Sequence, residues 1–155
     1  MAVVQITNPP NPLAQILEGS DGVSFDEMVA ASAAGIETLL PSIREFVRAR
    51  IIELTKIFEE GEESMFGRSA EIGALAMNIA EVAGAARLPS LGEVARGICA
   101  MVDSLLSAGV WHSEALNLHI TSLTLLNAGI PLPPDEIKKM LNQLREMRRA
   151  VGVLE

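Results

Sequence analysis

Apolar residues recur every three or four positions along most of the chain, which is the spacing of one face of an α-helix. The first run begins at a capping box of Ser24 and Glu27, and a second capping box is formed by Ser90 and Glu93. Between the first two runs, the acidic EEGEES at 59–64 is expected to be a solvated loop. No alternating strand pattern occurs, so the chain is predicted to be all-α. The helices are predicted at about 24–60, at about 69–83, from 90 onward, at about 113–127 and at about 135–151.

The order of these helices predicts an antiparallel four-helix bundle with an extra C-terminal helix. Residues 1–23 contain NPPNP and EGSDG and are expected to form an irregular N-terminal segment. The bundle is then expected to occupy residues 24–128. Residues 129–155 are expected to form a linker and a C-terminal amphipathic helix.

Composition narrows the classes of function. The chain of 155 residues suits one domain, and its 12 basic and 20 acidic residues give a net charge of −8. That balance argues against a nucleic-acid partner, because phosphates require a basic surface. The single cysteine, Cys99, suits a reducing compartment. We see no signal peptide and no apolar stretch long enough for a membrane span, and therefore expect a cytoplasmic protein.

Met77 departs from the apolar pattern of its helix. At 100° per residue, Ile72, Leu75 and Ile79 share one side, and Met77 lies nearly opposite them. Small residues would keep this outer face flat, and a flexible methionine suits an irregular partner surface. The alternatives are that the helical phase is wrong by a fraction of a turn, or that the last helix covers Met77. The predicted partner-binding face consists of Gly73, Ala74, Met77, Ala80, Glu81 and Gly84.

The helix that carries Met77, the turn that follows it and the Ala-rich helix after the turn resemble histidine phosphotransfer (HPt) domains. These domains are four-helix bundles of bacterial two-component signalling, and the chain is most similar to the HPt-like proteins of alphaproteobacterial chemotaxis operons. The resemblance covers about residues 24–128. It rests on Ala76-Met77-Asn78-Ile79, Ala83-Gly84, Leu88 to Gly92 with its Leu-Pro-x-Leu turn, and Leu118-His119-Ile120.

Aligning the turn places Met77 at the position of the phosphorylated histidine of that family. Ile79 then takes the place of the motif leucine, Ala80 of the supporting lysine, Glu81 of a glycine and Arg87 of the turn glycine. Phosphoryl transfer needs a nucleophilic nitrogen and a nearby cation. Met77 has no nucleophilic nitrogen, Ala80 supplies no positive charge in place of the lysine, and Glu81 would repel a phosphoryl group. The resemblance therefore implies a non-catalytic HPt-like protein without cofactor or metal. Its partner would be a response-regulator receiver domain or a histidine kinase.

The two histidines leave a second function open, in which the chain is an active phosphotransfer protein that uses His112 or His119. His119 is in phase with the apolar side of its helix, so we expect a buried imidazole bonded to a backbone carbonyl. His112 follows Trp111 at a helix start and is expected to be a residue of the cap region. The seven-residue separation of the histidines is not that of a zinc site. Cys99 is expected to act as a small hydrophobic residue.

The last predicted helix has its own apolar stripe, formed by Ile137, Met140, Leu144 and Met147. It also holds five of the chain's 12 basic residues. Packing on its own bundle is the default expectation for such a helix. The alternatives are a homodimer or a partner protein bound through the stripe, and the former would make the chain a structural helical oligomer.

Overall fold

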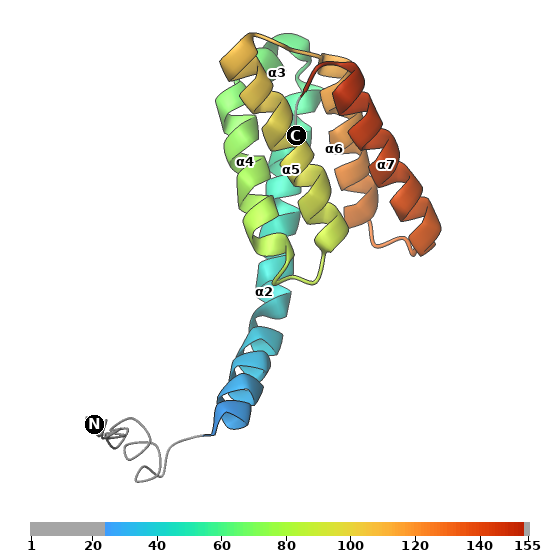
Figure 1. Cartoon of the computed structure of the whole chain (residues 1–155). Coiled ribbons are helices and arrows are strands. Elements are labelled where there is room, and N and C mark those ends of the chain that lie inside the picture. The colour runs from blue at the N-terminus through green and yellow to red at the C-terminus, as the bar shows by residue number, and fades with distance from the viewer. Residues whose placement is uncertain (1–23, 154–155) are drawn as a thin grey trace, which may run out of the picture. The chain divides into compact units, whose positions relative to one another are not determined.

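The computed structural model describes residues 24–153, and this part of the chain is helical, with no strand (Figure 1). The all-α prediction is therefore confirmed. The expectation of an irregular segment at residues 1–23 lies outside the described residues. The helices of the described part are α2 (Phe25–Glu59), α3 (Glu62–Gly67), α4 (Ser69–Ala83), α5 (Pro89–Ala108), α6 (Ser113–Asn127) and α7 (Pro134–Ala150).

The start of α2 confirms the first capping box. The backbone N–H of Ser24 donates to Oε2 of Glu27 at 2.7 Å, and the backbone N–H of Glu27 donates to Oγ of Ser24 at 3.2 Å. The bond from the Ser24 backbone lowers the pKa of the Glu27 carboxyl. Pro41 lies inside this helix.

The second predicted capping box is wrong, although a helix does begin there. Pro89 is the first residue of α5 and Leu88 occupies the N-cap position, without a side-chain cap. Proline favours the first helical position, because its fixed φ suits the helix and its missing N–H would have no partner there. Glu93 instead forms an ion pair with Arg145 of α7, with 2.6 Å between its Oε1 and the Nη2 of Arg145.

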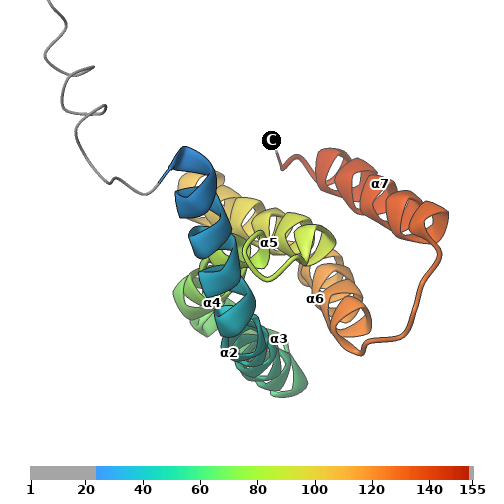
Figure 2. The same ribbon diagram turned by 90° about the horizontal axis from the view of Figure 1, so that it is seen from below.

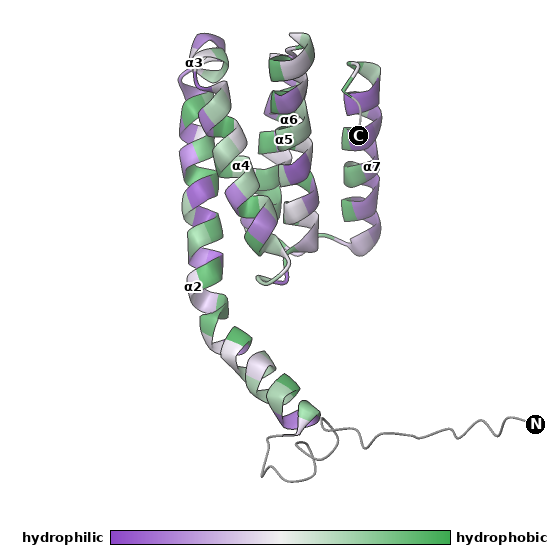
Figure 3. Cartoon of the chain, turned by 60° about the vertical axis from the view of Figure 1, so that its left-hand side comes forward, coloured by the Kyte–Doolittle hydropathy of each residue, from purple (hydrophilic) through white to green (hydrophobic). Residues whose placement is uncertain are grey.

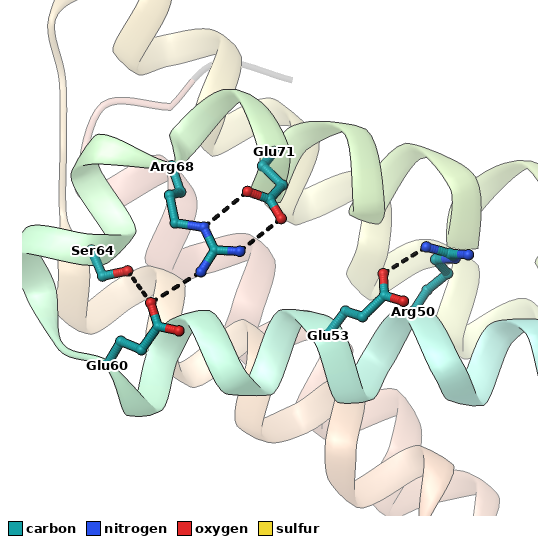
Figure 4. Close-up of polar contacts among 6 residues, drawn as sticks. All are labelled: Arg50, Glu53, Glu60, Ser64, Arg68 and Glu71. Atoms are coloured by element: carbon teal, nitrogen blue, oxygen red, sulfur yellow. Dashed lines mark hydrogen bonds and ion pairs between the residues drawn. The ribbon is translucent and has the colours of Figure 1, made fainter.

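The acidic segment after α2 is not a loop, which corrects the expectation for residues 59–64. Its second half forms the start of α3, which buries Met65 and carries Glu62 and Glu63 in its first turn, where the helix dipole favours carboxylates. The Arg68 guanidinium bridges this segment to α4, with hydrogen bonds of 2.8 Å to both carboxylate oxygens of Glu71. Its Nη1 lies 3.0 Å from Oε2 of Glu60 (Figure 4).

Hydrogen bonds in this cluster lower the pKa values of two carboxyls. Glu60 accepts a bond of 2.6 Å from the Ser64 hydroxyl, and this bond, followed by the bond from Arg68, lowers the pKa of Glu60. The Arg68 hydrogen bond lowers the pKa of Glu71. The acidic run was predicted to be solvated because its ion pair with Arg68 could not be foreseen from the sequence.

The chain divides inside α2, between Glu37 and Thr38, into two compact units. In the second unit, α5 lies between α4 and α6 (Figures 1 and 2). The inward apolar positions predicted from helical phase meet there in one buried core. The core includes Val47, Ile51, Leu54 and Ile57 of α2; Ile72, Leu75, Ala76 and Ile79 of α4; Leu91, Val94, Ala95, Ile98 and Val102 of α5; and Leu116, Ile120 and Leu123 of α6.

The last helix, α7, packs on α5 and α6 of its own chain. Figure 3 shows the apolar positions of α7 on the side that faces these helices. Leu144 is buried, while Ile137, Met140 and Met147 are half-buried. The apolar stripe is therefore largely used within the chain, as the default expectation had it. None of the described helices has the length and apolar character needed to cross a lipid bilayer.

Candidate functional site

Met77 lies in the middle of α4 and is exposed, as helical phase predicted. Its side chain retains 47% of its accessible surface. The alternative, that the last helix covers it, is answered by the packing of α7 on α5 and α6. This exposure leaves the Met77 side chain available to contact a partner, as was predicted for it.

Three of the other predicted residues share this exposed surface. Ala74, Glu81 and Gly84 are exposed, and their spacing with Met77 of three, four and three residues places all four on one side of α4. No heavy atom lies within 4 Å of the place a Cβ would take on Gly84. We call these four residues the Met77 strip. It presents one long thioether side chain and one carboxylate among small residues.

The remaining two, Gly73 and Ala80, lie on the flank of α4 that faces α5. A Cβ on Gly73 would lie 3.1 Å from Cγ1 of Val102, and the Cys99 thiol lies 3.9 Å from the Gly73 carbonyl oxygen. Ala80 is half-buried and packs against the core, close to Gly92 of α5. Because both residues are small, α4 and α5 can approach each other closely. Helical phase gives each residue an angle but does not say which neighbouring helix covers that angle.

Replacement of Gly73 tests this packing role. We expect Gly73→Leu to lower the free energy of unfolding by about 1–3 kcal/mol, because its side chain would displace Val102 from the core. The matched variant Gly84→Leu, on the exposed strip, should change it by about 0.5 kcal/mol or less. Urea unfolding followed by circular dichroism measures both. Equal losses would show that Gly73 has no special contact with α5.

His119 is completely buried, and both of its ring nitrogens are engaged. Nδ1 lies 2.8 Å from the carbonyl oxygen of Ala115, and Nε2 lies 2.9 Å from Nη1 of Arg148. Because a guanidinium only donates, Nε2 must accept and Nδ1 must carry the proton. Burial lowers the pKa of His119 to about 4, so the imidazole is neutral at pH 7. The expectation of a core histidine bonded to a backbone carbonyl is confirmed.

Arg148 is a buried functional group that sequence reasoning missed. It retains 6% of its accessible surface and is one of the five basic residues of α7, none of which was predicted to be buried. A signal was present, since Arg148 is four residues after Leu144 and therefore in phase with the apolar stripe. Gly97 of α5 makes room for the pair: a Cβ there would lie 2.5 Å from Nη1 of Arg148 and 2.9 Å from the imidazole.

The other reactive side chains considered from the sequence are placed as follows. His112 is exposed at the N-cap position of α6 and makes no side-chain cap bond. The Trp111 ring meets the Phe66 ring edge to face, with 5.8 Å between centroids. Cys99 is buried, and burial raises the pKa of its thiol, as suits a small hydrophobic residue. Residues 24–153 contain no group of three or more His, Cys, Asp and Glu side chains placed to hold a metal ion.

Of the candidate residues, those of the Met77 strip and His112 are exposed, while His119 is enclosed in the core. Comparisons of the chain with models of protein families, with curated proteins and with solved structures find no match.

Proposed function

We propose that this protein is a non-catalytic, HPt-like signalling protein of the bacterial cytoplasm that binds a response-regulator receiver domain or a histidine kinase. In this proposal α2, α4, α5 and α6 form the antiparallel four-helix bundle of that family, and α7 is an addition to it. The observation that carries the proposal is the exposure of Met77, 47%, at the position that the resemblance assigns to the phosphorylated histidine.

The chemistry of the Met77 strip favours binding over phosphoryl transfer. A thioether has no proton to exchange and does not replace an imidazole as phosphoacceptor. Ala80 supplies no cation, and its side chain packs toward the core. Glu81, one turn after Met77, is exposed and would repel a phosphoryl group. The strip can instead offer shape and dispersion contacts to a partner, which is the usual role of an exposed methionine at an interface.

Binding through the strip is tested with purified receiver domains encoded in the same genome as this chain, each with and without beryllofluoride, by isothermal titration calorimetry. We expect Met77→Glu to weaken binding at least tenfold, which corresponds to about 1.4 kcal/mol. The control is Ile130→Glu, which adds the same charge at an exposed apolar residue in the linker between α6 and α7. Circular dichroism verifies that both variants fold. Unchanged affinity for Met77→Glu, or an equal loss in both variants, would contradict the proposal.

The exposure of His112 favours a second candidate function, an active phosphotransfer protein. His119 is a poor phosphoacceptor in this fold, because it is buried and its Nε2 accepts a bond from Arg148. A receiver domain carrying radiolabelled phosphate separates the two functions. Acid-labile label that appears on the chain and is lost in His112→Ala would establish phosphotransfer and overturn the non-catalytic proposal. Binding of the receiver domain without transfer of the label would support the non-catalytic proposal.

A further inference from the structure

A groove between α5 and α7 brings together three of the chain's 12 basic side chains. It has a volume of about 460 Å³ and lies entirely within the second compact unit, which begins at Thr38. We call it the α5–α7 groove; its lining residues are Glu93, Arg96, Gly97 and Ala100 of α5 and Arg145 and Arg148 of α7.

The charge of this lining is opposite in sign to that of the chain. Three arginines contribute positive charges against the single negative charge of Glu93, a formal sum of +2, whereas the whole chain carries −8. A concave surface with one dominant sign of charge attracts ligands of the opposite sign. The lining therefore favours an anion, and its sum of charges matches a ligand with two negative charges.

Two of the three guanidinium groups are held in place by neighbouring side chains. Nη2 of Arg145 lies 2.6 Å from Oε1 of Glu93, and its Nη1 donates to Oδ1 of Asn142 at 2.8 Å. Arg148 is buried, and its Nη1 lies 2.9 Å from Nε2 of the neutral His119. Donors that are already ordered lose less conformational entropy when a ligand binds.

The third guanidinium group belongs to Arg96, which is exposed and lines the groove from α5. An exposed arginine can change its rotamer to meet a ligand, while Gly97 and Ala100 take up little of the space between the two helices. The planar fork of a guanidinium matches two oxygens of a phosphate group. A phosphate monoester carries about −1.5 to −2 charges at pH 7 and so matches the lining in charge as well.

From these observations we infer that the α5–α7 groove binds a phosphate dianion, either inorganic phosphate or the phosphate group of a small phosphate monoester. In this site Arg96, Arg145 and Arg148 donate to the phosphate oxygens, and Glu93 keeps Arg145 in position. The inference does not depend on the function proposed for the Met77 strip, because that strip belongs to α4 and the groove is formed by α5 and α7.

Nuclear magnetic resonance of the full chain, labelled with nitrogen-15, tests the site. The chain is titrated at pH 7.5 and constant ionic strength with sodium phosphate, with glycerol phosphate and with sodium acetate. We expect both phosphates to shift the amide signals of Gly97 and Ala100 saturably, with a dissociation constant of about 1 mM or lower. Acetate, with one charge, should bind at least tenfold more weakly.

The comparison of the two phosphates identifies the source of the ligand. Tighter binding of inorganic phosphate supports a site for free phosphate, and tighter binding of glycerol phosphate supports a site for a phosphorylated small molecule. Either result agrees with the inference. The absence of saturable shifts with both phosphates, or acetate binding as tight as theirs, would overturn it.

Charge-removing variants locate the site. Arg96→Gln and Arg145→Gln should each raise the dissociation constant for phosphate at least tenfold, because each removes a charged donor from the groove. The matched control is Arg48→Gln, which removes the same charge from an exposed position on α2 and should change the constant by about twofold or less. Circular dichroism verifies that all three variants fold. Unchanged affinity in either groove variant, or an equal loss in the control, would show that phosphate is not held in this groove.

Discussion

The Gly97→Ala variant is expected to lose about 2–3 kcal/mol of unfolding free energy, although alanine is the better helix former. The new Cβ would stand 2.5 Å from Nη1 of Arg148 and 2.9 Å from Cδ2 and Nε2 of His119. The ring cannot retreat easily, because His119 is fully buried. The guanidinium can move only by weakening its 2.9 Å bond to Nε2, which leaves a buried acceptor without its partner.

Urea unfolding measures this loss, with Gly67→Ala as the matched control. Gly67 ends α3 and has no heavy atom within 4 Å of the position of an added Cβ, so its replacement should change stability by about 0.5 kcal/mol or less. An increase in stability of Gly97→Ala by about 1 kcal/mol, the propensity gain alone, would show that the Arg148–His119 contact is easily rearranged. Such a result would also remove the reason for a glycine at this place in α5.

Acid should destabilise the protein through His119 in a defined pH range. The folded-state pKa of His119, about 4, lies below the usual value of 6.5, because burial disfavours the imidazolium. Between these values the unfolded chain binds more protons than the folded one, so stability falls as pH decreases from about 6.5 to 4. The loss attributable to this group approaches about 3 kcal/mol at pH 4.

The measurement compares urea unfolding of the wild type and His119→Gln between pH 7 and pH 4. Glutamine cannot titrate there, so the difference between the two stabilities isolates the histidine. Carboxyls with lowered pKa values, such as Glu60 and Glu71, also destabilise the fold on acidification, but they do so in both proteins. A constant difference across this range would mean that His119 takes up no proton on unfolding and would contradict the buried neutral imidazole.

The sequence allowed the helices to be predicted well because their signals are local. The bounds predicted from periodicity for α4 and α6 agree with the structure, and the capping box of Ser24 is present. The predicted start of α5 was one residue too late, because Pro89 occupies the first helical position and Ser90 is not the N-cap. The short α3 was missed because its stability comes from the burial of Met65 and from Arg68, which lie outside the acidic run itself.

The residues of the candidate site were likewise predicted correctly where the signal is local and incorrectly where it is not. Helical phase alone predicted that Met77 points away from the core, since the angle of a side chain about its own helix depends only on its position. Phase could not show that α5 covers Gly73 and Ala80, because that depends on which neighbour approaches the helix.

By itself, the sequence determined that the chain is helical, where most helices begin and end, and which side of each is apolar. Those properties follow from the backbone and from residues three or four positions apart. Only the tertiary structure decided that α7 packs on α5 and α6 and that Arg148 reaches His119, 29 residues away, beside Gly97. Local periodicity places Arg148 on the apolar side of α7, but it does not show which residues that side meets, because the contact arises from the close packing of helices that are distant in the sequence.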